Sequence, residues 1–176
     1  MGFDWKPLVL LAIPVELAAI VRLADFRFDL LSSTVFFTLF IGGLMLWKKK
    51  EIRAALLATG VPKEALFFLA AFAMVVLEEN VNCPRDGCAL LPWTLAPFAL
   101  LCIVEFAAVK IAKIKDWHVA VALFGAMGWF AEFGPGGSWA SELWALPLPV
   151  LAVMSALAFL IYAAIILVPA YVLVED

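Results

Sequence analysis

The chain has 176 residues, of which 66% are hydrophobic and 15% are charged, and its formal net charge is −3. A soluble domain is about half apolar and about one quarter charged, so this composition excludes an ordinary soluble domain and also a disordered chain. With 12 Lys and Arg against 15 Asp and Glu, the chain has no excess of positive charge for binding a nucleic acid.

Two apolar segments open the chain, and a membrane-spanning helix needs about 20 such residues. The first covers residues 7–23 and contains Glu16, which interrupts the apolar run of a signal peptide, so we expect a retained helix. The second covers residues 30–47, and the lysines at 48–50 are expected to end it. Residues 51–60 then predict a short amphipathic helix with Gly60 at its C-cap.

Four further apolar segments follow, and turn-rich loops separate some of them. The segment 63–80 closes on two glutamates, and the segment 89–109 is followed by three lysines. The last two segments are 117–133 and 149–173. The sequence therefore predicts one all-α integral membrane domain over residues 1–176, a bundle of about six transmembrane helices.

The basic residues predict how this bundle lies in the membrane. With six spans both termini lie on one side, and the segments on that side carry nine Lys and Arg residues against three in the opposite loops. Cytoplasmic loops carry the excess of Lys and Arg, so both termini are expected in the cytoplasm, with the cell membrane as the location. The nine are Lys6, Lys48, Lys49, Lys50, Arg53, Lys63, Lys110, Lys113 and Lys115, and the three are Arg22, Arg27 and Arg85.

Two glutamates, Glu16 and Glu105, are assigned to the membrane interior. A charged group at the centre of a span costs about 2.5–3.5 kcal/mol on insertion scales, so intramembrane carboxylates are functional candidates. Glu16 follows Pro14, which can open a small polar site in a helix. The alternatives are a hydrogen bond that only fixes helix packing for Glu16, and a side chain reaching interfacial water for Glu105.

A set of acidic residues is expected on the outer side of the membrane. It could form a vestibule that attracts cations, or it could be a solvated acidic surface. Its members are Asp25, Asp29, Glu78, Glu79 and Glu132.

Cys83 and Cys88 flank a Pro-Arg-Asp-Gly turn in the loop predicted to lie outside. Disulfides persist in oxidising compartments, so this pair is a candidate disulfide that staples the loop. A redox-active pair is the alternative, although the spacing differs from C-x-x-C and no second pair can relay electrons. Cys102 lies alone in the 89–109 segment and is expected to be a packing residue.

The sequence offers no nucleophile and base at a spacing that predicts catalysis, so we expect no catalytic residues. The one histidine, His118, argues against metal centres, and we expect no metal and no cofactor. The first hypothesis is a transport or permeation module for a cation or small solute that uses intramembrane carboxylates, with Glu16 as the proton or cation site and the acidic loops attracting the cation. The alternatives are a non-catalytic subunit of a larger membrane complex and a thiol-redox protein using Cys83 and Cys88. Expected partners are the lipid bilayer and other membrane subunits or a second copy.

Overall fold

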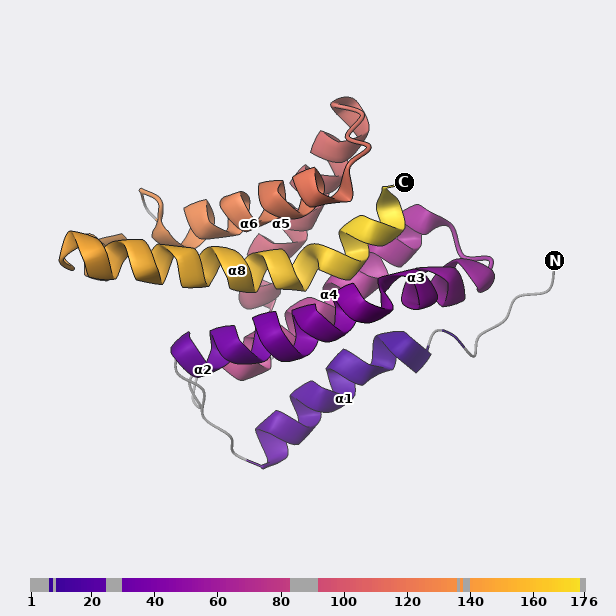
Figure 1. Cartoon of the computed structure of the whole chain (residues 1–176), viewed down its shortest axis with the longest axis horizontal. Helices are drawn as coiled ribbons and strands as arrows, with labels where there is room; N and C mark the ends of the chain where they lie inside the picture. The colour runs from indigo at the N-terminus through magenta and orange to yellow at the C-terminus, as the bar shows by residue number, and fades with distance from the viewer. Residues whose placement is uncertain are drawn as a thin grey trace.

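The computed structural model describes residues 7, 9–24, 30–82, 92–135, 137 and 140–174, without the side chains of 30, 82, 92–95, 142 and 143. These residues form helices and no strand, which confirms the all-helical prediction. The elements are α1 (Val9–Leu23), α2 (Leu30–Val35), the π-helix η2 (Phe36–Gly42), α3 (Gly43–Ala58), α4 (Lys63–Asn82), α5 (Pro92–Ile111), α6 (Trp117–Phe133), the short α7 (Ala140–Leu143) and α8 (Leu148–Leu173). Since α2, η2 and α3 are continuous, six long helices make up the described fold (Figure 1).

The lysine run at 48–50 follows the apolar segment but does not break the helix. The backbone stays helical from residue 30 to residue 58, because lysine is a good helix former even where it ends an apolar stretch. The expected separate helix over 51–60 is therefore the last part of α3. Gly60 follows it with a φ of +79°, the left-handed conformation that ends helices and that glycine adopts without penalty.

Helix α8 lies at the centre of the bundle and contacts α2, η2, α3, α4 and α6 (Figure 1). Its second half, from Ile161 to Leu173, is buried at nearly every position, whereas its first half exposes large apolar side chains such as Leu148 and Val153. Helix α1 packs on α4. Helix α5 contacts α4 and α6 and lies at the edge of the bundle.

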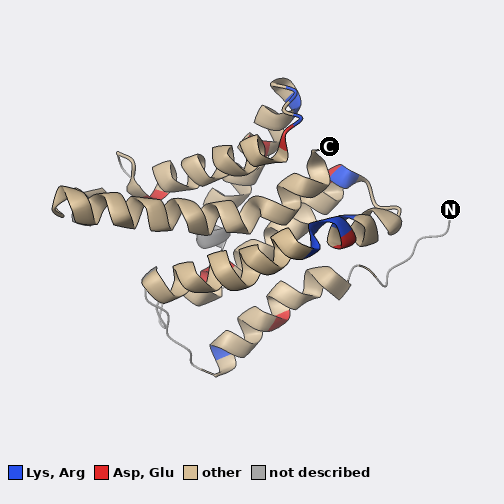
Figure 2. Cartoon of the chain, in the orientation of Figure 1, with Lys and Arg blue, Asp and Glu red and all other residues tan. Residues whose placement is uncertain are grey.

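The lysines gather at one end of the bundle, whereas acidic residues lie at both ends and in α1 (Figure 2). The end where α1 begins and α8 finishes also holds the lysine run of α3, the start of α4 and the turn between α5 and α6 (Figure 1). The acidic residues at this end are locally paired: Glu51 with Lys48 at 3.4 Å, Glu64 with Lys110 at 2.8 Å and Asp116 with His118 at 2.8 Å. At the other end, the last turns of α4 and α6 carry Glu78, Glu79 and Glu132.

Two helical segments in the described part of the chain are long and apolar enough to cross a membrane, namely Leu31–Ala58 and Leu148–Leu173. The 26 residues of α8 extend about 39 Å, and the hydrocarbon core of a bilayer is about 30 Å thick. Helix α6 is apolar but shorter, with 17 residues. Six transmembrane helices thus remain a prediction, whereas two helices with the required length and composition are present.

Candidate functional site

Glu105 is the most enclosed charged residue that the structure describes. It continues a buried stripe of α5 formed with Phe98, Cys102 and Val109, at the three- and four-residue spacing of one helix face. Its exposed fraction is 0%, and neither carboxylate oxygen has a hydrogen-bond partner among the described residues. An ionised carboxylate in such a place costs free energy unless it takes up a proton or a cation.

Helix α4 lies alongside the part of α5 that carries Glu105, as contacts made by Phe106 and Lys110 show. Lys110 binds Glu64 at 2.8 Å, and the Phe106 ring lies 6.0 Å from that of Phe67. Glu105 is therefore about 8 Å along the helix from Lys110, whose ammonium group is already engaged by Glu64. The sequence alternative, in which Glu105 reaches interfacial water, does not fit a side chain with no exposed surface.

Glu16 occupies the opposite kind of position. The buried face of α1 consists of Pro14, Ala18 and Val21, which pack toward α4. Glu16 lies two residues from both Pro14 and Ala18, about 200° around the helix from each, and its side chain is exposed. The structure thus places the two intramembrane candidates apart, with Glu105 inside the bundle and Glu16 on its outer surface.

Three of the five predicted outer acidic residues come together at one end of the bundle. Glu79 of α4 is close enough to Glu132 of α6 for their charges to interact, and Glu78 is buried with 7% of its surface exposed. Asp25 and Asp29 lie outside the described residues. Within the described residues no group of three or more His, Cys, Asp and Glu side chains is arranged to hold a metal ion.

Tyr162 of α8 lies at the centre of this acidic group, and the sequence analysis did not select it. Its hydroxyl donates to the Glu132 carboxylate at 2.9 Å and is also influenced by the charges of Glu78 and Glu79. Its ring stacks on Phe98 at 5.9 Å. The sequence feature that could have identified Tyr162 is its position in a long uncharged segment, because a buried tyrosine hydroxyl needs a hydrogen-bond partner.

At the lysine-rich end of the bundle, Lys49 and Arg53 make cation–π contacts with aromatic rings. Lys49 lies 4.2 Å from the Trp117 ring centroid and 5.1 Å from that of Tyr171, and Arg53 lies 5.6 Å from the same tyrosine. These contacts join α3, α6 and α8. Because a ring face attracts a cation, these contacts stabilise the lysine-rich end of the bundle.

Of the three cysteines, only Cys102 lies in the part of the chain that the structure describes. Cys83 and Cys88 lie outside the described residues, so both their disulfide and their redox role stay predictions. Cys102 is a buried free thiol in the stripe of Glu105, as the packing interpretation expects.

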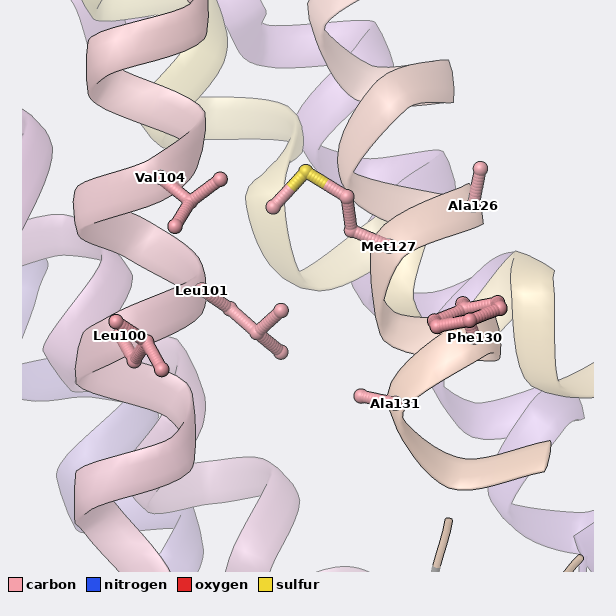
Figure 3. Close-up of a pocket in the computed structure, with 7 residues that line it drawn as sticks. All are labelled: Leu100, Leu101, Val104, Ala126, Met127, Phe130 and Ala131. Carbon is pink, nitrogen blue, oxygen red and sulfur yellow. The ribbon is translucent and has the colours of Figure 1, made fainter. Parts of the chain in front are cut away.

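An apolar groove separates α5 from α6 and has a volume of about 390 Å³ (Figure 3). Leu101 and Met127 point into it from opposite sides (Figure 3). Leu100 and Phe130 are largely exposed along it, with 62% and 59% of their surfaces accessible. The full lining is Leu100, Leu101, Val104, Ala126, Met127, Phe130 and Ala131. The chemistry of these side chains suits a hydrocarbon chain rather than a polar solute.

Comparison with known proteins gives no further guide to the site. No family model, no curated protein and no solved structure matches the chain.

Proposed function

We propose that the chain is an integral protein of the cell membrane whose six long helices all cross the bilayer, with both termini cytoplasmic. The two long apolar helices support this placement. So do the large apolar side chains on the outer surface, including Leu23, Ile111 and Leu148, which are 87%, 82% and 76% exposed. Most charged groups lie toward the ends of the helices, and an exposed acidic residue in α1 is an exception (Figure 2).

Within that placement, the proposed function is movement of a proton or small cation with Glu105 as the internal binding group. The observation that carries this proposal is the fully enclosed Glu105 carboxylate, whose two oxygens have no partner among the described residues. A side chain that only fixed helix packing would be expected to use those oxygens in hydrogen bonds. Carboxylates in the membrane interior mark ion pathways and proton relays.

The acidic group at the other end of the bundle fits the same function. Glu78, Glu79 and Glu132 come from the ends of α4 and α6 and place negative charge on the side opposite the lysines. Such a surface raises the local concentration of cations. In this proposal it attracts the cation, and Glu105 binds it inside the bundle.

The test is flux in vesicles reconstituted with the full chain. Proton entry is followed with an enclosed pH-sensitive dye, and Na⁺ and K⁺ are tested in parallel. Glu105→Gln keeps the side-chain shape, and because the Glu105 oxygens have no described partner, the fold is expected to persist. We expect its flux to fall to the leak of protein-free vesicles.

The matched control is Glu51→Gln, which removes an exposed carboxylate at the basic end. We expect it to transport like the wild type. Wild-type flux through the Glu105→Gln variant would contradict the proposed role of Glu105.

A second candidate function is a non-catalytic subunit of a membrane complex, which the position of Glu16 favours. Glu16 is near the middle of α1 on its exposed side, where it would face lipid if the chain were alone. Because that placement is costly, another protein with a hydrogen-bond donor would stabilise it. Native mass spectrometry after mild extraction is expected to show a larger assembly that Glu16→Leu weakens, and a wild-type monomer alone would contradict this candidate.

A further inference from the structure

The enclosure of Glu105 means that a cation reaches it only when neighbouring side chains move. Its exposed fraction is 0%, and the buried stripe of α5 continues from it toward the acidic end of the bundle through Cys102 and Phe98. Phe98 lies seven residues before Glu105, or about 10 Å along the helix. A cation that enters at the acidic end and follows this stripe therefore meets Phe98 before it meets Glu105.

Three buried rings from three helices meet at the level of Phe98. The Tyr162 ring of α8 stacks on Phe98 of α5 with the centroids 5.9 Å apart, and it lies 6.4 Å from the Phe124 ring of α6. None of the three side chains has more than 6% of its surface exposed. Because hydrocarbon rings do not replace the hydration of a cation, this aromatic layer of Phe98, Phe124 and Tyr162 is a barrier on the route to Glu105.

One hydrogen bond ties the aromatic layer to the acidic group. The Tyr162 hydroxyl donates to the Glu132 carboxylate at 2.9 Å, so the Tyr162 ring is held between α5 and α6. The charges of Glu78 and Glu79 on α4 also act on this hydroxyl. A hydrogen bond to an ionised group is about twice as strong as one between neutral groups. The position of the ring therefore depends on an acidic residue at the end where cations are expected to arrive.

We propose that the aromatic layer is a gate between the acidic end of the bundle and Glu105, and that the hydrogen bond between Tyr162 and Glu132 holds this gate closed. The inference rests on the function proposed above, in which Glu105 binds the cation. The structure is the closed state. In the open state the Tyr162 ring leaves Phe98, and the route along the α5 stripe to Cys102 and Glu105 becomes accessible. Loss of the hydrogen bond raises the population of that open state.

Cys102 is a natural probe of the gate, because it lies between Phe98 and Glu105 on the same face of α5. It follows Phe98 by four residues and has 5% of its surface exposed. A reagent dissolved in water modifies such a thiol only while the structure around it is open, so the rate of modification follows the open population. The chain has three cysteines, and replacing Cys83 and Cys88 by serine leaves Cys102 as the single thiol.

The experiment measures how fast Cys102 reacts in intact cells that express the full chain in this background. A cationic methanethiosulfonate reagent that does not cross membranes is added outside, where the acidic end is placed, and the mass of the purified chain gives the modified fraction over time. We expect slow modification with Tyr162 present. Tyr162→Phe keeps the ring and removes the hydroxyl, so the rate should rise about tenfold or more, as expected for loss of a hydrogen bond to a charged group.

Two further variants separate the gate from a general loosening of the bundle. Glu132→Gln keeps an acceptor oxygen but removes its charge, so the rate should rise less than in Tyr162→Phe. Tyr171→Phe removes the hydroxyl of the other buried tyrosine of α8, at the lysine-rich end, and should leave the rate unchanged. Equal rates with and without the Tyr162 hydroxyl, including no reaction in either case, would overturn the proposal, and so would an equal rise in Tyr171→Phe.

Failure of the gate is distinguishable from failure of the proposed function, because modification of Cys102 does not require Glu105 to bind a cation. Adding Glu105→Gln to Tyr162→Phe should leave the rapid modification unchanged. Loss of flux in Glu105→Gln together with a rate that Tyr162→Phe does not change contradicts the gate alone. Wild-type flux in Glu105→Gln together with rapid modification in Tyr162→Phe contradicts the role of Glu105, while the hydrogen bond still controls access to the stripe.

Discussion

Tyr162 joins three helices through a single side chain. Its ring stacks on Phe98 of α5, and its hydroxyl binds Glu132 of α6 at 2.9 Å. A Cβ atom placed on Gly128 of α6 would overlap the Cγ and Cδ1 atoms of Tyr162. The absence of a side chain at Gly128 therefore allows α6 and α8 to approach closely at this point.

We predict that Gly128→Ala destabilises the protein. The added methyl group meets ring atoms close to the α8 backbone, which cannot move away as the end of a flexible side chain can. Overpacking of this kind costs about 1–3 kcal/mol, which exceeds or offsets the gain of about 1 kcal/mol from replacing glycine in a helix. Thermal unfolding in detergent measures the change.

Gly43→Ala is the matched control, because it also replaces a glycine in a continuous helix. A Cβ atom there meets only the carbonyl oxygen of Thr38, at 3.8 Å, which is an ordinary contact. We expect its stability to be equal to the wild type or up to about 1 kcal/mol greater. Equal effects of the two substitutions would argue against the close contact at Gly128.

The Asp116 carboxylate caps the start of α6, and we predict that the stability of this first turn depends on pH. The hydrogen bond from the His118 side chain, together with that from its backbone N–H, lowers the pKa of Asp116 below its ordinary value of 3.8. The capping interaction is therefore fully present above pH 3.8 and is lost as the pH falls through the lowered pKa.

Hydrogen exchange of the first turn of α6 tests this prediction. We expect protection to decrease as the pH drops below the ordinary pKa of Asp116, after correction for the intrinsic exchange rate. The Asp116→Asn variant keeps an acceptor oxygen without a titrating group and should show a flat profile in the same range. A decrease of equal size in Asp116→Asn would show that another group is responsible.

The two intramembrane glutamates show what a sequence predicts about a residue and what it does not. Both were selected because of their depth in an apolar segment, which can be read from spacing alone. Which face of a helix is buried depends on the helices that pack against it. Helix α1 packs through Pro14 and Ala18, so Glu16 faces outward. Helix α5 buries the face that includes Cys102, so Glu105 faces inward. Tyr162 was missed for a related reason, because its importance comes from residues on α5 and α6.

At the scale of the helices, the ends of an apolar segment do not have to coincide with the ends of the helix that contains it. The segment ending near residue 47 was predicted from hydrophobicity, and the helix that contains it continues to Ala58. Charge ends an apolar run because of the cost of burial in lipid, but the backbone hydrogen bonds of a helix do not depend on that cost. Proline marks a helix boundary at some positions only: α4 starts just after Pro62, whereas Pro14, Pro97 and Pro169 lie inside helices.

The ion pair between Glu64 and Lys110 links α4 with α5 at the basic end. The two groups are 2.8 Å apart, and each side chain has 42% of its surface exposed. Because exposed pairs are screened by water, we predict a coupling free energy of only about 0.2–1 kcal/mol. A double-mutant cycle with Glu64→Gln and Lys110→Gln measures it, and a coupling above about 2 kcal/mol would show that the pair is shielded from solvent.

At the scale of the whole molecule, the separation of charge was predictable from sequence. Local runs such as the lysines at 48–50 determine the sign at each end, and a bundle of antiparallel helices places alternate connections together. The groove between α5 and α6 was not predictable, because it depends on how far apart two helices lie.

The central claim, that the chain crosses the membrane with its lysine-rich end inside, is tested most directly by single-cysteine labelling. Cys83, Cys88 and Cys102 are first replaced by serine or alanine, and Lys50→Cys, Lys115→Cys or Pro135→Cys is then introduced at an exposed position. In intact cells, an impermeant thiol reagent should label the cysteine at 135, while those at 50 and 115 should react only after the membrane is opened. Labelling of all three positions from the same side would contradict the account.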